Sequence, residues 1–487
     1  MKKYFQLLFI LTLAIGLHSC DDELNELQPF TEGNPETFFT DVASFQLGVD
    51  GAYSQLRNYY ASSGSGMQGI PDILSDNAIL VQSGRRSNQD YFNWVYVAST
   101  GGAIPLYFSE AYEAVNAANL VIGQIDNLAD GPEKDNILGQ ALATRAFAHF
   151  DLVRTYAKIP TQSADAGSSP GIVYMKVEDG DTGDPLDNPA RETVASNYAE
   201  IIGDLEAAAD LIEPTTTVAG RMDGNSVNGL LSRVYLYTGD WQNAIDAANR
   251  VTTPIAGINE IALIYTDESD AGLVIEFPVN TTSESGFSNV GVLYSQSNSG
   301  ATISEYAVEF EFSQSLQNND VRTDIIQFVG TNADNDYNAI KKFLGETGQV
   351  NGRVDLKPLR AAEVLLNKAE AQFNLGLEAD ALATLDELRI ERFEDFNPAT
   401  DGGETGAALE EAIQYNRRVE LAFEGHRFFD LKRRGESIVR SNNGDIIDGS
   451  GTPPVNLTLP AGNFRFQLPI PIGEINANPN FAQNEGY

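Results

Sequence analysis

Cysteine, histidine and tryptophan are scarce in this chain. Its 487 residues include one cysteine, three histidines and two tryptophans. One cysteine excludes an intramolecular disulfide. The sequence also has no Cys/His cluster with the spacing of zinc ligands and no glycine-rich loop of the phosphate-binding pattern. Neither a structural zinc site nor a nucleotide-phosphate cradle is therefore expected.

Basic residues are also few. Lysine and arginine number 31 against 69 aspartates and glutamates, which gives a formal net charge of −38. A field of this sign repels nucleic acid and anionic membrane surfaces, so we expect no nucleic-acid partner. The same excess favours solubility in salt, and a saline habitat is a hypothesis that stability across a salt series would test.

The single cysteine, Cys20, follows an N-terminal secretion pattern. Lys2 and Lys3 precede an apolar run over 5–17 that is too short for an ordinary transmembrane helix. The run ends in Leu-His-Ser-Cys, which resembles a lipobox, where the cysteine becomes the acylated N-terminus. A plain secretory signal with an incidental cysteine is the alternative. Acidic residues at 21–23 resemble the tag that directs lipoproteins to the outer cell surface. We therefore expect a signal peptide over 1–19 and an acidic tether over 20–33.

Helical periodicity dominates the rest of the chain. It predicts helices over 35–56, 104–128 and 133–156, with Pro35 at the first helical position. The stretches 228–251 and 360–392 each read as helix, Gly-containing turn and second helix, and both resemble tetratricopeptide units.

Long irregular stretches separate these helices. They cover 61–100, 161–189, 266–304, which contains a short apolar strand at 273–277, and 435–462. Loops of this length are uncommon in compact domains and often carry function. We therefore expect the ligand site in 61–100 and 266–304.

The segment 415–435 combines an apolar stripe with a dense row of charge. Read as one helix, it places Tyr415, Val419 and His426 on one face. Arg417, Glu420, Glu424, Arg427 and Asp430 form a parallel row at helical spacing, so neighbours of opposite sign can pair along the helix. We expect Glu420 and Glu424 to form a structural ion network with Arg417, Arg418 and Arg427, rather than the acid and base of a glycosidase, and His426 to be buried.

This segment, RRVELAFEGHRFFDLKR, closely resembles the C-terminal signature of the SusD/RagB family, and the ending RFQLPIPIGEINANPNFAQNEGY resembles the family's final signature. YEAVNAANLVIGQI and GQALATRAFAHFDLVRTYAKIP resemble its second and third helices. The resemblance implies a mostly α fold in which tetratricopeptide-like helical pairs form a right-handed superhelical scaffold with a loop-rich segment packed on it. It also implies one compact body, with an N-terminal region over 34–260 and a C-terminal region over 261–487.

The family resemblance implies a function as well. Its members are surface lipoproteins that capture nutrients beside a SusC-like TonB-dependent transporter. We therefore expect a non-enzymatic protein, lipid-anchored in the outer membrane and facing the exterior, that binds oligosaccharide or polysaccharide. A peptide-capturing, RagB-like lipoprotein is the alternative, and a glycosidase is a third.

Aromatic and polar residues in 61–100 are the candidate ligand contacts, because sugars lay their C–H faces on rings while polar groups take the hydroxyls. The ring candidates are Tyr91, Trp94 and Tyr96, and Tyr294 in the second loop; the polar candidates are Asp76, Asn77, Arg85, Arg86 and Asn93. The alternative is a buried β-like segment with Trp94 in the core.

No cofactor is expected. Structural calcium is considered at the loop aspartates Asp179, Asp181, Asp184 and Asp187, since oxygen-rich loops suit that ion. Their spacing fits no EF-hand, and a solvated acidic loop is the alternative. The negative charge favours a neutral glycan, although Arg85 and Arg86 are a local basic pair.

Overall fold

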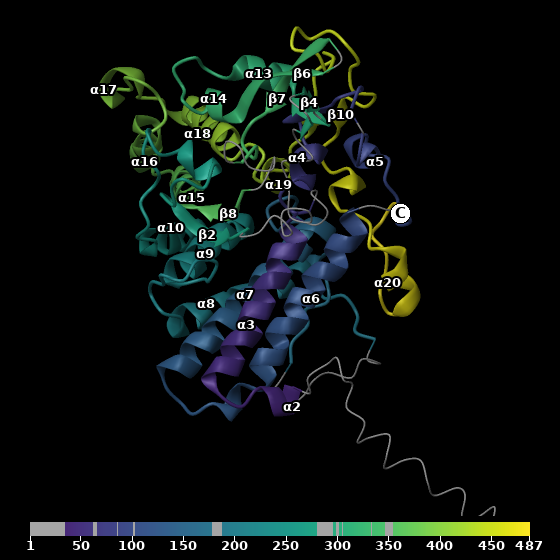
Figure 1. The fold of residues 1–487 in the computed structure, drawn as a ribbon, viewed down its shortest axis with the longest axis vertical. Coiled ribbons are helices and arrows are strands. Elements are labelled where there is room, and N and C mark those ends of the chain that lie inside the picture. The colour runs from purple at the N-terminus through teal and green to yellow at the C-terminus, as the bar shows by residue number, and fades with distance from the viewer. Residues whose placement is uncertain are drawn as a thin grey trace, which may run out of the picture.

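The computed structural model describes residues 35–61, 66–84, 86–100, 103–177, 188–279, 296–298, 301–303, 305–332, 334–345 and 354–487. Over these residues the protein is mostly helical, which confirms the fold class expected from the sequence (Figure 1).

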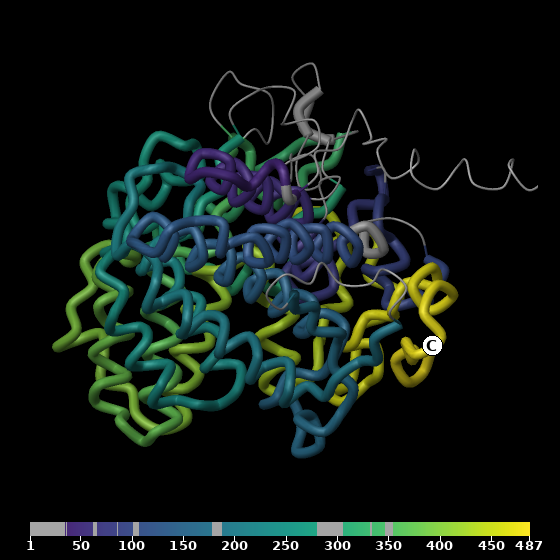
Figure 2. The backbone as a smooth tube through the Cα atoms, turned by 90° about the horizontal axis from the view of Figure 1, so that it is seen from below, coloured from purple at the N-terminus to yellow at the C-terminus, as the bar shows by residue number. Residues whose placement is uncertain are grey.

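Four long helices form the N-terminal half. They are α3 (Val42–Ala61), α6 (Ala103–Gly123), α7 (Pro132–Tyr156) and α8 (Val194–Leu211). Contacts join α3 to α6, α6 to α7 and α7 to α8, and the helices run side by side in the lower part of the view (Figure 1). Helices α3 and α6 both contact α7, and the view from below shows the purple α3 next to the blue α6 (Figure 2).

The first helix of the described chain is broken, which corrects the single helix predicted over 35–56. A short helix, α2 (Pro35–Phe38), ends before α3 begins. The Ser44 amide donates to Asp41 Oδ1 over 2.9 Å, and the Asp41 amide donates to Ser44 Oγ over 3.1 Å. This reciprocal capping satisfies the first free N–H groups of α3 and starts a new helix there.

Two helical pairs confirm the tetratricopeptide-like prediction. The first is α9 (Gly224–Thr238) with α10 (Trp241–Arg250), and the second is α15 (Ala361–Asn374) with α16 (Glu378–Ile390). Gly239 and Gly376 adopt φ values of 75° and 77° at the two turns. Glycine reaches this left-handed region without steric cost, which lets each first helix stop and reverse. Helix α10 packs on α15, so the pairs stack.

Strands are short and antiparallel. The largest sheet has the order β1 (Ala78–Leu80), β5 (Tyr306–Val308), β7 (Asn335–Ile340), β6 (Gln327–Asn332). Two-stranded sheets pair β2 (Leu273–Phe277) with β8 (Leu356–Arg360), β3 (Gln296–Asn298) with β4 (Ala301–Ile303), and β9 (Ile438–Val439) with β10 (Thr458–Leu459). The strand predicted at 273–277 is confirmed as β2.

Short helices complete the upper and C-terminal parts. They are α4 (Ile70–Leu74), α5 (Gln89–Phe92), α13 (Phe310–Ser315), α14 (Thr323–Ile326), α17 (Pro398–Asp401), α18 (Gly406–Glu420), α19 (Arg427–Arg433) and α20 (Ile472–Ala477).

The segment 415–435 is two helices, which corrects the prediction of one. Helix α18 ends at Glu420, and α19 begins at Arg427. Between them Phe423 and Gly425 adopt φ values of 65° and 81°. A Cβ at Gly425 would lie 2.5 Å from the carbonyl oxygen of Met67, so the close approach of the segment around Met67 requires glycine there.

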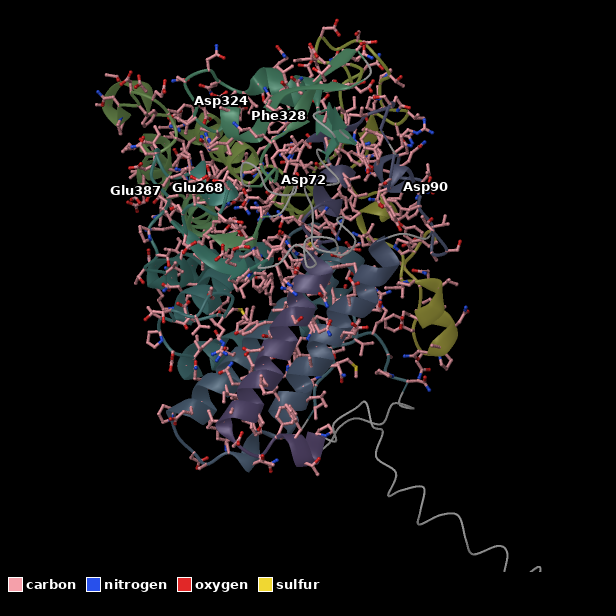
Figure 3. The ribbon with its side chains drawn as sticks, in the orientation of Figure 1. Asp72, Asp90, Glu268, Asp324, Phe328 and Glu387 are labelled. Atoms are coloured by element: carbon pink, nitrogen blue, oxygen red, sulfur yellow. The ribbon has the colours of Figure 1, made fainter. Side chains whose placement is uncertain are left out.

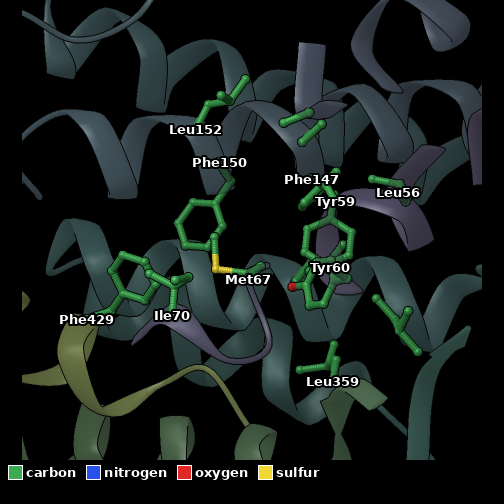
Figure 4. Packing of buried hydrophobic residues seen from close by; sticks show 14 of the residues in the cluster. Leu56, Tyr59, Tyr60, Met67, Ile70, Phe147, Phe150, Leu152, Leu359 and Phe429 are labelled. Atoms are coloured by element: carbon green, nitrogen blue, oxygen red, sulfur yellow. The ribbon is translucent and has the colours of Figure 1, made fainter. Parts of the chain in front are cut away.

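One hydrophobic core runs from the long helices into the C-terminal half. Met67, Phe150, Ile70 and Phe429 meet in it, although they come from segments far apart in the sequence (Figure 4). This core holds the segment around Met67 and helix α4 between α7 and α19, and α4 leads into the candidate ligand region.

Candidate functional site

Trp94, the foremost predicted ligand contact, lies inside the protein. Its side chain is 4% exposed. The indole Nε1 donates to the carbonyl oxygen of Leu74 over 2.9 Å, and the Arg440 guanidinium lies 4.0 Å from the ring centroid. No face of the ring is open in this structure, so the exposed aromatic platform predicted here is replaced by a packed ring.

Arg440 holds the region around Trp94 together. Its guanidinium lies over the Phe92 ring as well as the Trp94 ring, at 4.0 Å from each centroid. It donates to the carbonyl oxygens of Ile73, Ser75 and Phe92 over 2.5–2.9 Å. Burial lowers the pKa of Arg440 to about 9, against the opposing attraction of Asp76. One buried cation thus satisfies the C-terminal carbonyls of both α4 and α5.

Tyr91 and Tyr96 are also buried. Their rings stack with centroids 5.3 Å apart, and Tyr487 stacks on the far side of Tyr96 at 6.2 Å. The Tyr96 hydroxyl donates to the carbonyl oxygen of Arg465. The C-terminal segment therefore covers these two rings, so neither presents a face to solvent.

The predicted polar contacts Asp76 and Asn77 serve as internal anchors. Arg427 donates to both Asp76 carboxylate oxygens over 2.7 and 2.8 Å, and Arg418 Nε donates to Asn77 Oδ1 over 2.9 Å. Burial alone would raise the pKa of Asp76, but Arg418 and Arg427 outweigh it and hold the pKa well below the usual range. These groups bind α4 and β1 to α18 and α19.

Of the remaining four candidates, two lie within the described residues and two lie outside them. Arg86 is exposed and donates to Gln82 Oε1 over 3.2 Å, whereas Asn93 is 9% exposed. Arg85 and Tyr294 lie outside the described residues. Asp90, also exposed, lies at the same edge of the molecule (Figure 3). Of the predicted residues in 76–96 that the structure describes, Arg86 alone is exposed and the others are buried.

The region is buried, as the alternative stated, but it is not β-like. Tyr91 belongs to α5, and Trp94, which follows the C-cap residue Asn93, has a left-handed φ of 52°. Tyr91, Asn93, Trp94 and Tyr96 are buried while Val95 is 49% exposed, so a simple two-sided alternation is absent. The helical turn, closed by the Trp94 amide on the Tyr91 carbonyl, sets this pattern.

Glu420 and Glu424 belong to a buried ion network, but its cations are not the ones expected. Glu420 accepts from Arg360 over 2.9 Å and from Arg392 over 2.8 Å, and Arg360 Nε also donates to Glu424 over 2.7 Å. Burial raises the pKa of Glu420, but Arg392 and Arg360 outweigh it and hold that pKa well below its usual range.

The cations expected to pair with these glutamates bind elsewhere. Arg417 pairs with Asp430 over 2.8 Å, and Arg427 pairs with Asp76. His426 is buried at 4% exposure, as predicted, with Nε2 3.5 Å from Glu363.

Asp72 is a buried carboxylate that no pattern in the sequence singles out. It accepts from the amides of Phe423 and Gly425 over 3.1 and 3.0 Å and from Asn77 Nδ2 over 3.0 Å. Burial raises the pKa of Asp72 to about 6 against these hydrogen bonds. It lies in the interior on α4 (Figure 3) and holds the turn between α18 and α19 through these hydrogen bonds. The residues near position 72 carry no pattern that predicts this contact.

Three carboxylates gather at the β2–β8 ladder. Oxygens of Asp267, Glu276 and Asp355 lie within 4.8 Å of one another. The buried ammonium of Lys357 lies 2.8 Å from Asp267 and 4.0 Å from Glu276. This internal cation offsets part of their charge. The four aspartates considered for calcium in the sequence lie outside the described residues.

Two open clefts lie away from the packed ring cluster. One, of about 780 Å³, lies between α10, α15 and α16, with Lys368, Glu260 and Glu387 among its lining residues. The other, of about 460 Å³, lies between α6, the stretch Val173–Val177 and α20. Pockets of 300–1,000 Å³ are typical of small-ligand sites.

Neither Cys20 nor the tether falls within the described residues. Among the helices that the structure describes, none combines the length and the apolar character needed to cross a bilayer.

Comparison with known proteins gives concordant matches over both halves. The model of the SusD family matches residues 284–487, and a model described as "Starch-binding associating with outer membrane" matches residues 40–236. SusD-like protein P2 of Formosa agariphila is 24% identical, and the alignment covers all of both chains.

Solved structures share the fold. One from Bacteroides vulgatus is 26% identical with a TM-score of 0.79, and the match covers 93% of this chain and all of that one. A structure titled "Laminarin binding SusD-like protein" is 21% identical with a TM-score of 0.69, covering 91% of this chain and 99% of that one. Since two family models match in sequence order and the fold is shared over nine-tenths of its length, the chain belongs to the SusD-like family.

Proposed function

We propose that this protein is a non-enzymatic, surface-exposed lipoprotein of the outer membrane that binds oligosaccharide or polysaccharide and delivers it to a SusC-like TonB-dependent transporter. The observation that carries the proposal is the pair of SusD-type matches over 40–236 and 284–487, one of them described as starch-binding. The laminarin-binding neighbour of the same fold supports a glycan as ligand. Cys20 would supply the anchor, since several acyl chains on one residue hold a protein stably in a bilayer.

A binding role fits the chemistry of the described carboxylates better than hydrolysis does. Glycoside hydrolysis needs one carboxylic acid that holds a proton beside one carboxylate in an accessible cleft. Glu420 and Glu424 are both buried and engaged by Arg360. Their ion pairs with Arg360 therefore join α18 and the turn after it to β8.

The proposed binding surface is the edge formed by α5 and its flanks. Arg86 and Asp90 are exposed there and can exchange hydrogen bonds with hydroxyls, and Val95 and Val97 are 49% and 48% exposed. Trp94 and Tyr96 support this surface from beneath. Their packing holds it in one conformation, which lowers the entropic cost of binding.

Calorimetry of the mature chain, residues 20–487, against a broad polysaccharide panel tests the proposal. We expect binding in the micromolar range, about −8 kcal/mol, because the ligand must also be released to the transporter. No heat of binding with any glycan would refute it. Binding of peptides alone would favour the RagB-like alternative, and release of shortened sugars would establish an enzyme.

Arg86→Ala tests the location of the surface. We expect the affinity for the bound glycan to fall by about fivefold, the effect of losing one charge-assisted hydrogen bond at an exposed site. Arg250→Ala removes an equally exposed arginine from α10 and should leave the affinity unchanged. Equal affinities of the two variants would place the ligand elsewhere.

A further inference from the structure

The cleft between α6 and α20 combines an apolar floor with a polar rim. Phe108, Val115, Val173 and Phe481 line it and are each no more than 7% exposed, while Met175 in the same lining is 38% exposed and presents apolar surface to the cleft. The Phe108 ring meets Phe481 edge-on, with centroids 6.2 Å apart. Rings locked in this way form a fixed floor, so the cleft of about 460 Å³ does not depend on a movement of the walls.

Most polar groups of the walls already have partners. The Tyr112 hydroxyl donates to the carbonyl oxygen of Val173 over 2.9 Å. Asn119 donates to Met175 and accepts from Arg145. Asn478 donates to Pro189 and accepts from the amide of Asn480. These groups shape the cleft and offer a ligand little further hydrogen bonding.

The free hydrogen-bonding capacity lies on the rim. Glu113 and Asn116 are exposed on α6, and Glu474 is half-buried on α20. Among the residues that the structure describes, no lysine or arginine nitrogen lies within 4.0 Å of either carboxylate, while Lys176 on the opposite wall pairs with Glu200. An ionised carboxylate only accepts hydrogen bonds, so a ligand here must donate them.

We propose that this cleft is a second saccharide subsite, which takes a neutral sugar and rejects uronate and sulfated units. Hydroxyl groups donate to Glu113 and Glu474, whose charge strengthens each bond. Met175, the exposed apolar residue of the lining, receives the C–H face of the sugar. A carboxylate or sulfate on the ligand would meet two carboxylates that no described cation pairs. Lys176, the lysine of the described lining, is held by Glu200, so like-charge repulsion excludes such a ligand.

The proposal rests on the glycan-binding function and adds a location and a charge class to it. The cleft lies on α6 and α20, whereas Asp90 belongs to α5 and Arg86 comes shortly before it. A polysaccharide that reached both would gain affinity from two linked contacts without either being tight.

The test is calorimetry on the mature chain with laminarin and maltoheptaose as neutral probes and an alginate oligomer as the uronate probe. In the double variant Glu113→Gln/Glu474→Gln we expect affinity for the better neutral probe to fall about tenfold, as two charge-assisted bonds weaken. The ratio of neutral to alginate affinity should fall as well, a change that a loss of structure would not produce.

The matched control is Glu133→Gln/Glu411→Gln. Both residues are exposed on helices outside the cleft, with no ion pair to any described residue, and the pair removes the same charge. We expect parental affinities for all three probes. Far-UV circular dichroism of both double variants checks that each is folded.

Each remaining outcome decides the matter. If the double variant binds the neutral probes as tightly as the parent, the subsite is refuted and the proposed function stands. Binding of alginate alone overturns neutral selectivity and also spares the function. If the parent protein binds none of the three probes, the subsite is refuted. The proposed function is refuted only if the protein also binds nothing in the broad polysaccharide panel. Glu113- and Glu474-dependent capture of the peptide Lys-Leu-Lys, with laminarin unaffected, would assign the cleft to a cationic ligand.

Discussion

Arg440 shows how a single buried charge can organise a loop region. It has no carboxylate within ion-pair distance among the described residues. Its guanidinium nitrogens instead donate hydrogen bonds to three main-chain carbonyls. Its guanidinium lies over the rings of Phe92 and Trp94, at 4.0 Å from each centroid, a contact that guanidinium groups favour. The residue therefore replaces the capping that short helices such as α4 and α5 cannot supply for themselves.

Replacing Arg440 by methionine should destabilise the protein by about 3 kcal/mol, because three buried carbonyls would lose their donor. Urea denaturation measures the change. Arg434→Met is the matched control: Arg434 is partly exposed, pairs with Glu410 and Glu436, and should cost no more than about 0.5 kcal/mol. Equal losses in the two variants would contradict the capping role.

Among the elements, the β2–β8 ladder carries a built-in sensitivity to pH. Burial raises the pKa of Glu276 to about 7, Lys357 opposes this, and Asp355, Asp270 and Asp267 add to it. The unfolded pKa is 4.5. Above pH 7 the ionised glutamate weakens the fold. As the pH falls through 7 the native state takes up a proton and gains stability, until the unfolded chain also protonates near 4.5.

Glu276→Gln should therefore stabilise the protein by about 2 kcal/mol at pH 8 and make little difference at pH 4.5. Denaturation midpoints at a series of pH values give the comparison. Glu268→Gln removes a charge from the exposed neighbouring loop (Figure 3) and should shift stability by less than about 0.5 kcal/mol at every pH. A constant gain for Glu276→Gln at all pH values would show that its proton is not the cause.

Some elements could be predicted from the sequence because the residues that determine them lie within the segment itself. Periodicity predicted α7 and the α15–α16 pair almost to their ends, since the apolar spacing and Gly376 lie within each segment. The turn at 421–426 was not predictable, because Asp72 holds it from some 350 positions away.

The candidate site was harder to predict than the helices. The sequence predicted Asp76, Trp94 and Tyr96 as ligand contacts, but Arg427 binds Asp76, Arg440 lies over Trp94 and Tyr487 stacks on Tyr96. A local sequence pattern does not show that residues far away in the chain will bury a side chain. The α6–α20 cleft was missed for the same reason.

At the scale of the whole molecule, attachment to the membrane is expected to depend on one residue. Cys20→Ser should abolish metabolic labelling with palmitate and release the protein from the outer-membrane fraction, since no described helix could hold it there. Ser19→Ala keeps both the cysteine and a small residue before it, so labelling should persist. A Cys20→Ser protein that stays in the outer membrane would show that another contact anchors it.

The stack of Tyr487 on Tyr96 has a consequence for how the protein is made. Residues near position 96 emerge from the ribosome long before residues near position 487. The N-terminal region must then wait, with Tyr96 and its neighbours uncovered, until nearly the whole chain has followed. Contacts so distant in sequence slow folding and leave apolar surface open in the meantime. Any factor that accompanies the chain during synthesis therefore has to protect the rings around Tyr96 until the last residues have been added.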